Sequence, residues 1–299
     1  MTDSLDRRDF LAASGTALAI ASLASSVTAA DVKPKRRFLK SVKSGMVRAG
    51  KDLTEKFQLL ADVGFDGVDV SQRHEHDEVL EAKEKSGLTV HGVVGYDHWK
   101  IPLSHPDLAT RKKGLKSFIG VIEDAHAYGA TSALLVPAVV NKEVGYKTAY
   151  ENSQEMIREA IPVAAEKKIK ILFENVWNNF LLSPVEMARY VDEFESKWVG
   201  VYFDVGNIVR YGWPEHWIVA LGNRIGKIDV KEYSRKLQNS KGPYAGFKVK
   251  IGEGDCDWPA VVKALESINF RGWCTAEVGG GDRERMADIK ARMDRVLPG

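Results

Sequence analysis

The sequence predicts an α/β fold and, within that class, a closed (β/α)8 TIM barrel. Short apolar runs alternate with longer amphipathic segments from about residue 37 onward. Eight such strand–helix units fit into this part of the chain, and a (β/α)8 barrel typically has about 250 residues. An open, doubly wound parallel sheet is the alternative that the same alternation permits.

The predicted strands are short runs rich in Val, Ile, Leu and Phe, as expected for parallel strands covered on both faces. In chain order they are residues 39–47, 67–71, 88–94, 132–138, 169–176, 199–205, 225–233 and 272–278. The longest irregular segment, residues 234–256, follows the seventh strand, and we expect it to form a loop over the strand ends.

Helices are predicted between the strands, most clearly at residues 53–64, 114–129 and 150–169. In the last of these, apolar residues recur at steps of three and four and form one apolar face: Met156, Ile157, Ala160, Ile161 and Ala164. Glycines that are typical of helix C-termini stand just before the next strand at positions 64, 87 and 129. Asp257, before Trp258-Pro259, is expected to cap a late helix.

The first thirty residues are predicted to be a twin-arginine export signal. Arg7-Arg8 precede a modestly apolar run to about Leu23, and small residues follow near Ala29 and Ala30. The run is too short and too rich in Ala, Ser and Gly to span a bilayer well, so cleavage is favoured over a membrane anchor. We therefore expect a periplasmic or otherwise exported protein with one barrel domain at residues 37–299.

Composition narrows the classes of function. The chain is 44% hydrophobic and 28% charged with a net charge of +2, which is ordinary for a globular protein with a sizeable core. Basic and acidic residues are interspersed, so a nucleic-acid partner has no support. The two cysteines, Cys256 and Cys274, do not make a disulfide framework and are expected to be unpaired thiols.

Four late strands each carry an acid near the carboxyl end: Glu174, Asp204, Asp229 and Glu277. In a barrel these ends converge on one face, where active sites are built. One such acid alone would be read as a helix cap or a member of an ion pair. Four would repel each other strongly, and a divalent cation between them removes the conflict. All-oxygen ligation favours Mn2+ or Mg2+.

The same stretches carry a family resemblance. "FEN", "FDVGN", "IDVKEYSR", "IGEGDCDWPAVVKALE" and "GWCTAEV" resemble the sugar phosphate isomerase/epimerase family with a xylose-isomerase-like TIM barrel, which includes hydroxypyruvate isomerases and ketose 3-epimerases. The resemblance covers about residues 38–296. It implies that the four acids hold the metal and that Glu174 and Glu277 form an acid/base pair. That pair would move a proton beside a carbonyl through an enediolate.

Two positions depart from the family pattern. The third metal ligand is usually a His in an "HxKD" stretch, and here it is Asp229 in "DVKE". The family also tends to have a substrate-contacting His three residues after the second ligand, and here that residue is Asn207. The first change makes the site more anionic and favours Mn2+ or Mg2+ further. The second removes an imidazole that would polarise the substrate.

Six residues are predicted to contact a sugar or keto-sugar substrate: Asn207, Lys231, Arg235, His98, Trp99 and Trp177. Lys231 stands two residues after Asp229 and therefore points to the same side of the strand. For Lys231 and Arg235, neutralising the acids is as good an interpretation as substrate contact. His98 and Trp99 follow the third strand, where an imidazole and an aromatic wall suit a sugar. His74 and His76 are interpreted as surface residues.

The leading functional prediction is a metal-dependent sugar isomerase or epimerase. Because export suits a free or glycosidic sugar, the alternative is a lyase that removes the proton at C2 of a 3-keto-glycoside and expels the C1 substituent, with the same metal and base. A nuclease is disfavoured because histidines are absent from the late strand ends. A non-catalytic sugar-binding barrel is disfavoured by the intact Glu174 and Glu277. Association into a homo-oligomer is left open.

Overall fold

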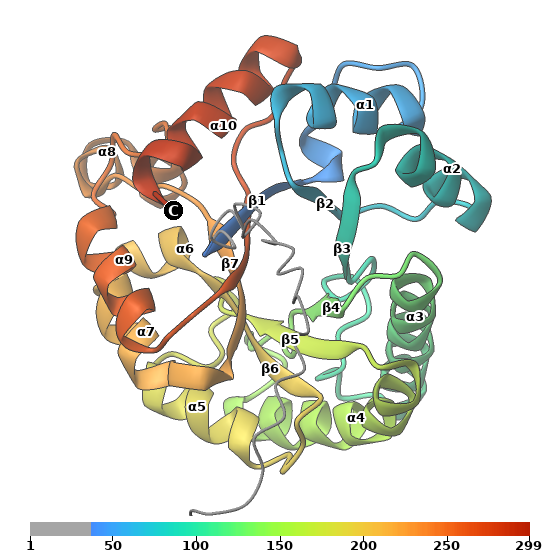
Figure 1. The fold of residues 1–299 in the computed structure, drawn as a ribbon. Helices are drawn as coiled ribbons and strands as arrows, with labels where there is room; N and C mark the ends of the chain where they lie inside the picture. Colours follow the sequence, from blue (N-terminus) through green and yellow to red (C-terminus); the bar gives the residue numbers. More distant parts are fainter. Residues whose placement is uncertain (1–36) are drawn as a thin grey trace, which may run out of the picture. The chain divides into compact units, whose positions relative to one another are not determined.

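The structure, a computed structural model, describes residues 37–299, which form one closed barrel of eight parallel strands in chain order (Figure 1). The fold class predicted from the sequence is confirmed. The strands are β1 (Phe38–Lys43), β2 (Gly67–Val70), β3 (Thr89–Val94), β4 (Ser132–Leu135), β5 (Lys170–Glu174), β6 (Val199–Asp204), β7 (Ile225–Val230) and β8 (Gly272–Ala276). The predicted export signal lies outside the described residues.

Helices form a ring around the barrel (Figure 1). They are α1 (Leu53–Val63), α2 (His76–Ser86), α3 (Leu108–Ala127), α4 (Tyr146–Lys167), α5 (Pro184–Asp192), α6 (Val205–Val209), α7 (Pro214–Leu221), α8 (Arg235–Lys241), α9 (Trp258–Ser267) and α10 (Arg283–Val296), with 3-10 turns η1 (Ser44–Met46), η2 (Gly222–Arg224) and η3 (Pro243–Phe247). Asp257 caps α9 as predicted, because its side chain accepts a hydrogen bond from the backbone N–H of Ala260. The final turn of α1 closes on Gly64, whose φ of 93° suits glycine.

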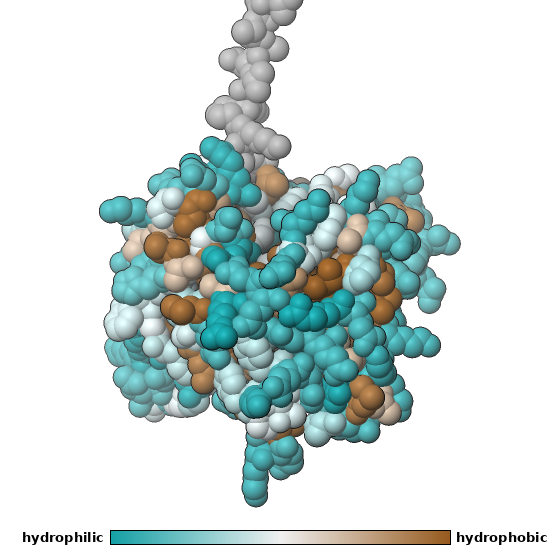
Figure 2. All heavy atoms as spheres, turned by 90° about the horizontal axis from the view of Figure 1, so that it is seen from below, coloured by the Kyte–Doolittle hydropathy of each residue, from teal (hydrophilic) through white to brown (hydrophobic). Residues whose placement is uncertain are grey.

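The main apolar core lies between the strands and the surrounding helices. Both cysteines are buried and unpaired, as expected. Among residues 37–299, no helix combines the length and apolar character needed to cross a bilayer. The face shown in Figure 2 is mostly hydrophilic, with hydrophobic residues in small, separate groups.

Alternate residues of the strands point into the barrel, and just below the carboxyl ends many of these inward residues are polar. One step below the carboxyl ends, Tyr202 donates its hydroxyl to Asp69 at 2.8 Å and lies 2.6 Å from the hydroxyl of Thr275. Lys227 contacts the ring and the backbone carbonyl of His91. All five side chains are almost fully buried. A layer of hydrogen-bonded polar groups therefore forms the floor beneath the strand ends.

A buried carboxylate outside the barrel fixes the long loop after β7. Glu232, 1% exposed, accepts hydrogen bonds from the backbone N–H groups of Gly252 (2.7 Å) and Cys256 (3.0 Å) and from the indole N–H of Trp258 (2.8 Å). The segment of residues 234–256, predicted to be irregular, contains α8 and η3, and its far end is held by Glu232, the residue that follows Lys231. This arrangement places η3 over the strand ends.

We predict that Glu232→Gln destabilises the protein by about 1.5–3 kcal/mol, because the charge-assisted hydrogen bonds to the loop are weakened. The midpoint of urea unfolding, followed by circular dichroism, measures the change. Glu253→Gln is the matched control on the same loop. Its carboxylate pairs with Arg292 at 2.8 Å but is 53% exposed, so its removal should cost less than about 1 kcal/mol. Equal shifts for the two variants would contradict the assignment.

Candidate active site

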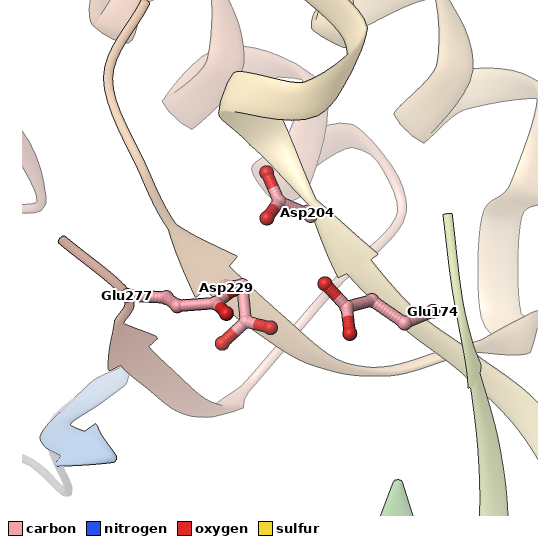
Figure 3. Close-up of side chains that lie close together, drawn as sticks. All are labelled: Glu174, Asp204, Asp229 and Glu277. Atoms are coloured by element: carbon pink, nitrogen blue, oxygen red, sulfur yellow. The ribbon is translucent and has the colours of Figure 1, made fainter. Parts of the chain in front are cut away.

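The structure brings the four predicted acids together. Glu174 is the last residue of β5 and Asp204 the last residue of β6. Asp229 is the second-last residue of β7, and Glu277 directly follows β8. Each offers one carboxylate oxygen, and these atoms all lie within 4.8 Å of one another. Figure 3 shows the four side chains converging, with Glu174 and Glu277 entering from opposite sides. Asp204 and Asp229 are fully buried and Glu174 nearly so.

Two lysines partly balance this charge. The ammonium group of Lys43, at the end of β1, lies 2.9 Å from Asp229 and 3.1 Å from Glu277. The ammonium group of Lys231 lies 2.7 Å from Asp204 and 2.9 Å from Glu277. These contacts agree with the interpretation that Lys231 neutralises the acids. Lys43 was not among the predicted site residues, although its position at the carboxyl end of an apolar strand matches that of the acids.

The environments of Glu174 and Glu277 push their pKa values apart. Burial raises the pKa of Glu174 to about 8, against the opposing effect of Lys43. Burial also acts to raise the pKa of Glu277, but Lys43 and Lys231 outweigh it and lower the pKa to about 2. At neutral pH one carboxyl group therefore holds a proton and the other is ionised. Such a split is typical of an acid/base pair.

Asparagines hold Asp204 in place. The side-chain amide of Asn175 brackets the residue, accepting a hydrogen bond from its backbone N–H and donating one to its carbonyl, both at 2.8 Å. Asp204 Oδ1 accepts a hydrogen bond from the backbone N–H of Asn207 and so caps α6. Asp204 is thus a helix cap and a member of the cluster at once. Its other oxygen, Oδ2, points to Lys231.

A divalent cation fits this set of side chains. Asp229 Oδ1 is buried and has no hydrogen-bond donor within the described residues, and Asp204 Oδ2 and Glu277 Oε2 are paired only by lysine ammonium groups. The donor atoms are all carboxylate oxygens, which hard ions such as Mn2+ and Mg2+ prefer. The residues that would hold the ion are Glu174, Asp204, Asp229 and Glu277.

A cavity of about 610 Å³ opens above the carboxylates. It is lined by Trp99, Glu174, Val176, Trp177, Asn207, Lys231, Tyr244, Phe247, Glu277, Val278 and Gly279. Four of the six predicted substrate-contacting residues are in this set: Trp99, Trp177, Asn207 and Lys231. Tyr244 and Phe247 were not among the predicted site residues, because no periodic pattern shows which residues of the long segment after β7 face the strand ends.

The structure places His98 and Arg235 away from the lining of this cavity. His98 Nδ1 accepts a hydrogen bond from the backbone N–H of Val136, and burial lowers the pKa of the ring to about 4. The guanidinium of Arg235 donates to the backbone carbonyls of Val209 and Gly212 at 3.0 and 2.7 Å. Both side chains thus hold loops that surround the site.

Comparisons with known proteins agree with the barrel fold. A family model described as "Xylose isomerase-like TIM barrel" matches residues 57–296. The putative L-ribulose-5-phosphate 3-epimerase SgbU of Escherichia coli (strain K12) is 26% identical over 247 residues, which cover 74% of this chain and 82% of that protein.

Two solved structures share the fold. A D-tagatose 3-epimerase-like protein superposes with a TM-score of 0.74 at 18% identity, covering 86% of this chain and 96% of its own. The 3-keto-D-glucoside 4-epimerase YcjR from E. coli superposes with a TM-score of 0.72 at 16% identity, covering 88% and 99%.

We predict that Mn2+ binding releases at least one proton per ion at pH 7, because burial raises the pKa of Glu174 to about 8 and that of Asp229 well above its usual value, and both must be ionised to act as ligands. Isothermal titration calorimetry in two buffers of different ionisation enthalpy measures the release. The apparent affinity should rise about tenfold per pH unit between pH 6 and 8. Glu174→Gln should bind the ion more weakly and release fewer protons. Unchanged release in this variant would contradict the assignment.

Proposed function

Because this chain belongs to the xylose isomerase-like TIM barrel family, we propose that it is a metal-dependent sugar epimerase or isomerase that moves a proton at a carbon beside a carbonyl. One observation carries the proposal. Four carboxylates from β5 to β8 converge beneath the cavity, and two of them, Glu174 and Glu277, line it from opposite sides (Figure 3). The epimerase names of the relative and of the structural neighbours support the same class of reaction.

A bound divalent ion would supply Lewis-acid polarisation of the carbonyl and neighbouring hydroxyl oxygens of the substrate. Glu277 is ionised, because the two lysines stabilise its charge, and it can accept the proton when the C–H bond breaks. The electron pair of that bond then moves toward the carbonyl. Glu174 approaches from the other side and can pass a proton taken up from solvent to the opposite face of the carbon, which inverts the carbon centre.

Polar and aromatic side chains around the cavity orient the substrate. Lys231 and Asn207 line the cavity side by side, with the ammonium group 3.4 Å from the side-chain oxygen of Asn207, and both present groups suited to sugar hydroxyls. Trp177 is held by a 2.9 Å hydrogen bond from its indole N–H to the backbone carbonyl of Asn207. The lysines also keep the carboxylates in place before substrate arrives.

The same groups would serve a 1,2-eliminating lyase acting on a 3-keto-glycoside. In that reaction Glu277 accepts the proton, and the substituent on the adjacent carbon leaves with its bonding electrons, assisted by a proton that Glu174 passes on from solvent. Products distinguish the two reactions, because epimerisation conserves the mass of the substrate whereas elimination releases the aglycone. Export by the twin-arginine pathway, which we infer from residues 1–30, would place either reaction in the periplasm.

We predict that the Mn2+-loaded protein in D2O incorporates deuterium at the carbon beside the carbonyl of a ketose or 3-keto-glycoside. Glu277→Gln and Glu174→Gln should each slow this exchange by at least about 100-fold, because general acid–base catalysis contributes 10²–10⁴-fold. Mass spectrometry and proton NMR measure the exchange and identify the product. Glu151→Gln, 63% exposed on α4, is the control and should retain it. Unchanged exchange in Glu277→Gln would overturn the mechanism.

A further inference from the structure

Aromatic side chains surround the mouth of the cavity. We call Trp99, Trp177, Tyr244 and Phe247 the aromatic rim; all four line the cavity. Trp99 is 53% exposed and Tyr244 is 74% exposed, whereas Glu174 at the base of the same cavity is 6% exposed. The rim therefore lies on the solvent side of the carboxylates. Large apolar rings left in water at the edge of a site are typical of surfaces that bind a ligand.

The rim has two opposing sides. Trp99 comes from the loop after β3, and Tyr244 and Phe247 come from the loop after β7. In a closed ring of eight strands in chain order, β3 and β7 stand opposite each other. A ligand that projects from the carboxylates toward solvent must therefore pass between aromatic rings.

The β7 side of the rim is built as a firm wall. The ring of Trp177 lies 4.8 Å from that of Phe247 and 5.5 Å from that of Tyr244, between ring centroids. Arg210 covers another part of Trp177, with its guanidinium carbon 4.6 Å from the ring centre. The hydrogen bond from Trp177 to Asn207 fixes the ring further. Such a preorganised wall binds a flat or apolar face at little entropic cost.

The charges in the cavity disfavour a phosphate. Of the residues that line it, Glu174 and Glu277 are acids and Lys231 is the one cation. The ammonium group of Lys231 already pairs with Asp204 and Glu277. A phosphate ester would add negative charge beside these carboxylates with no lining cation left to pair it. An uncharged ligand has no such cost.

We propose that the substrate is an uncharged keto-glycoside with two rings. Its keto-sugar ring lies over the carboxylates, and the ring of its C1 substituent packs between Trp99 and Tyr244. This inference rests on the proposed function, because it assumes that the reaction takes place beside a carbonyl of the sugar ring. The size of the cavity agrees, since pockets of roughly 300–1,000 Å³ take ligands much larger than one sugar ring. A second sugar ring and an aromatic aglycone share the apolar face that aromatic side chains bind.

The test compares substrates on the Mn2+-loaded protein. The substrates are methyl, phenyl and glucosyl 3-keto-glucosides, a free ketohexose and a ketopentose phosphate, and the measurement is kcat/KM for deuterium exchange. We expect the phenyl or the glucosyl glycoside to exceed the methyl glycoside by at least about tenfold. Preference for phenyl would assign an aromatic aglycone, and preference for glucosyl would assign a disaccharide-like substrate.

Variants of the rim make the test specific. Trp99→Ala and Tyr244→Ala should each bring the ratio between the two-ring and methyl glycosides toward one. Trp213→Ala is the matched control, because Trp213 is 56% exposed but lies outside the cavity lining, and it should keep the ratio of the unaltered protein.

Two outcomes would overturn the inference while leaving the proposed function in place. The first is that kcat/KM for deuterium exchange is the same for the methyl, phenyl and glucosyl glycosides and equally high for the free ketohexose. The second is that the ketopentose phosphate is the preferred substrate and that the Arg210→Met variant loses this preference. That result would show that Arg210 binds the phosphate. Absence of exchange with every substrate would instead overturn the proposed function, and the inference with it.

Discussion

Electrostatic repulsion among four carboxylates is the constraint on which the rest of this structure depends. The acids lie close enough that one oxygen from each falls within 4.8 Å of the others. In the described part of the chain, Lys43 and Lys231 are the cations that pair with them. Two ammonium groups cannot neutralise four ionised carboxylates, so the cluster either retains a proton or accepts a cation. Burial raises the pKa values of Glu174, Asp229 and Asp204, so these three carboxyl groups are the ones that favour holding that proton. The capacity to bind an ion and the capacity to donate a proton thus have one physical origin.

The barrel geometry makes this concentration of charge tolerable. Alternate residues on each strand share the inner face, so Lys227, Asp229 and Lys231 follow one another up the inside of β7 and its extension. Beneath the carboxylates, Tyr202, Thr275, Ser41 and His91 join in a hydrogen-bonded layer. Buried polar groups of this kind are stable only when they are satisfied. The hydrogen-bonded floor therefore fixes which residues of each strand face the interior and, with them, the direction in which the acids point.

In the function that we propose, chemistry and substrate selection belong to different elements. The reacting groups lie on strand ends, where packing and backbone hydrogen bonds limit their movement. The aromatic rim lies on the loops after β3, β5 and β7, and Glu232 anchors the largest of these loops from outside the barrel. Loops can change without disturbing the strand ends. Under the proposed function, this division would let the strand ends keep one set of reacting groups while the loops select the sugar.

The sequence by itself determined the alternation of eight strands with helices and the four acids at strand ends, because strand periodicity and strand-end position are local properties. It favoured a closed barrel over an open sheet through the number of units, and the structure settled the closure and the strand order. The sequence also placed Trp99, Trp177, Asn207 and Lys231 at the site. Only the tertiary structure decided that Lys43, 186 residues before Asp229, pairs with it, that Tyr244 completes the rim, and that His98 and Arg235 serve the surrounding loops. It alone separated the pKa values of Glu174 and Glu277. Charge pairing, burial and loop docking depend on distances between segments remote in the chain, and a one-dimensional pattern carries no record of those distances.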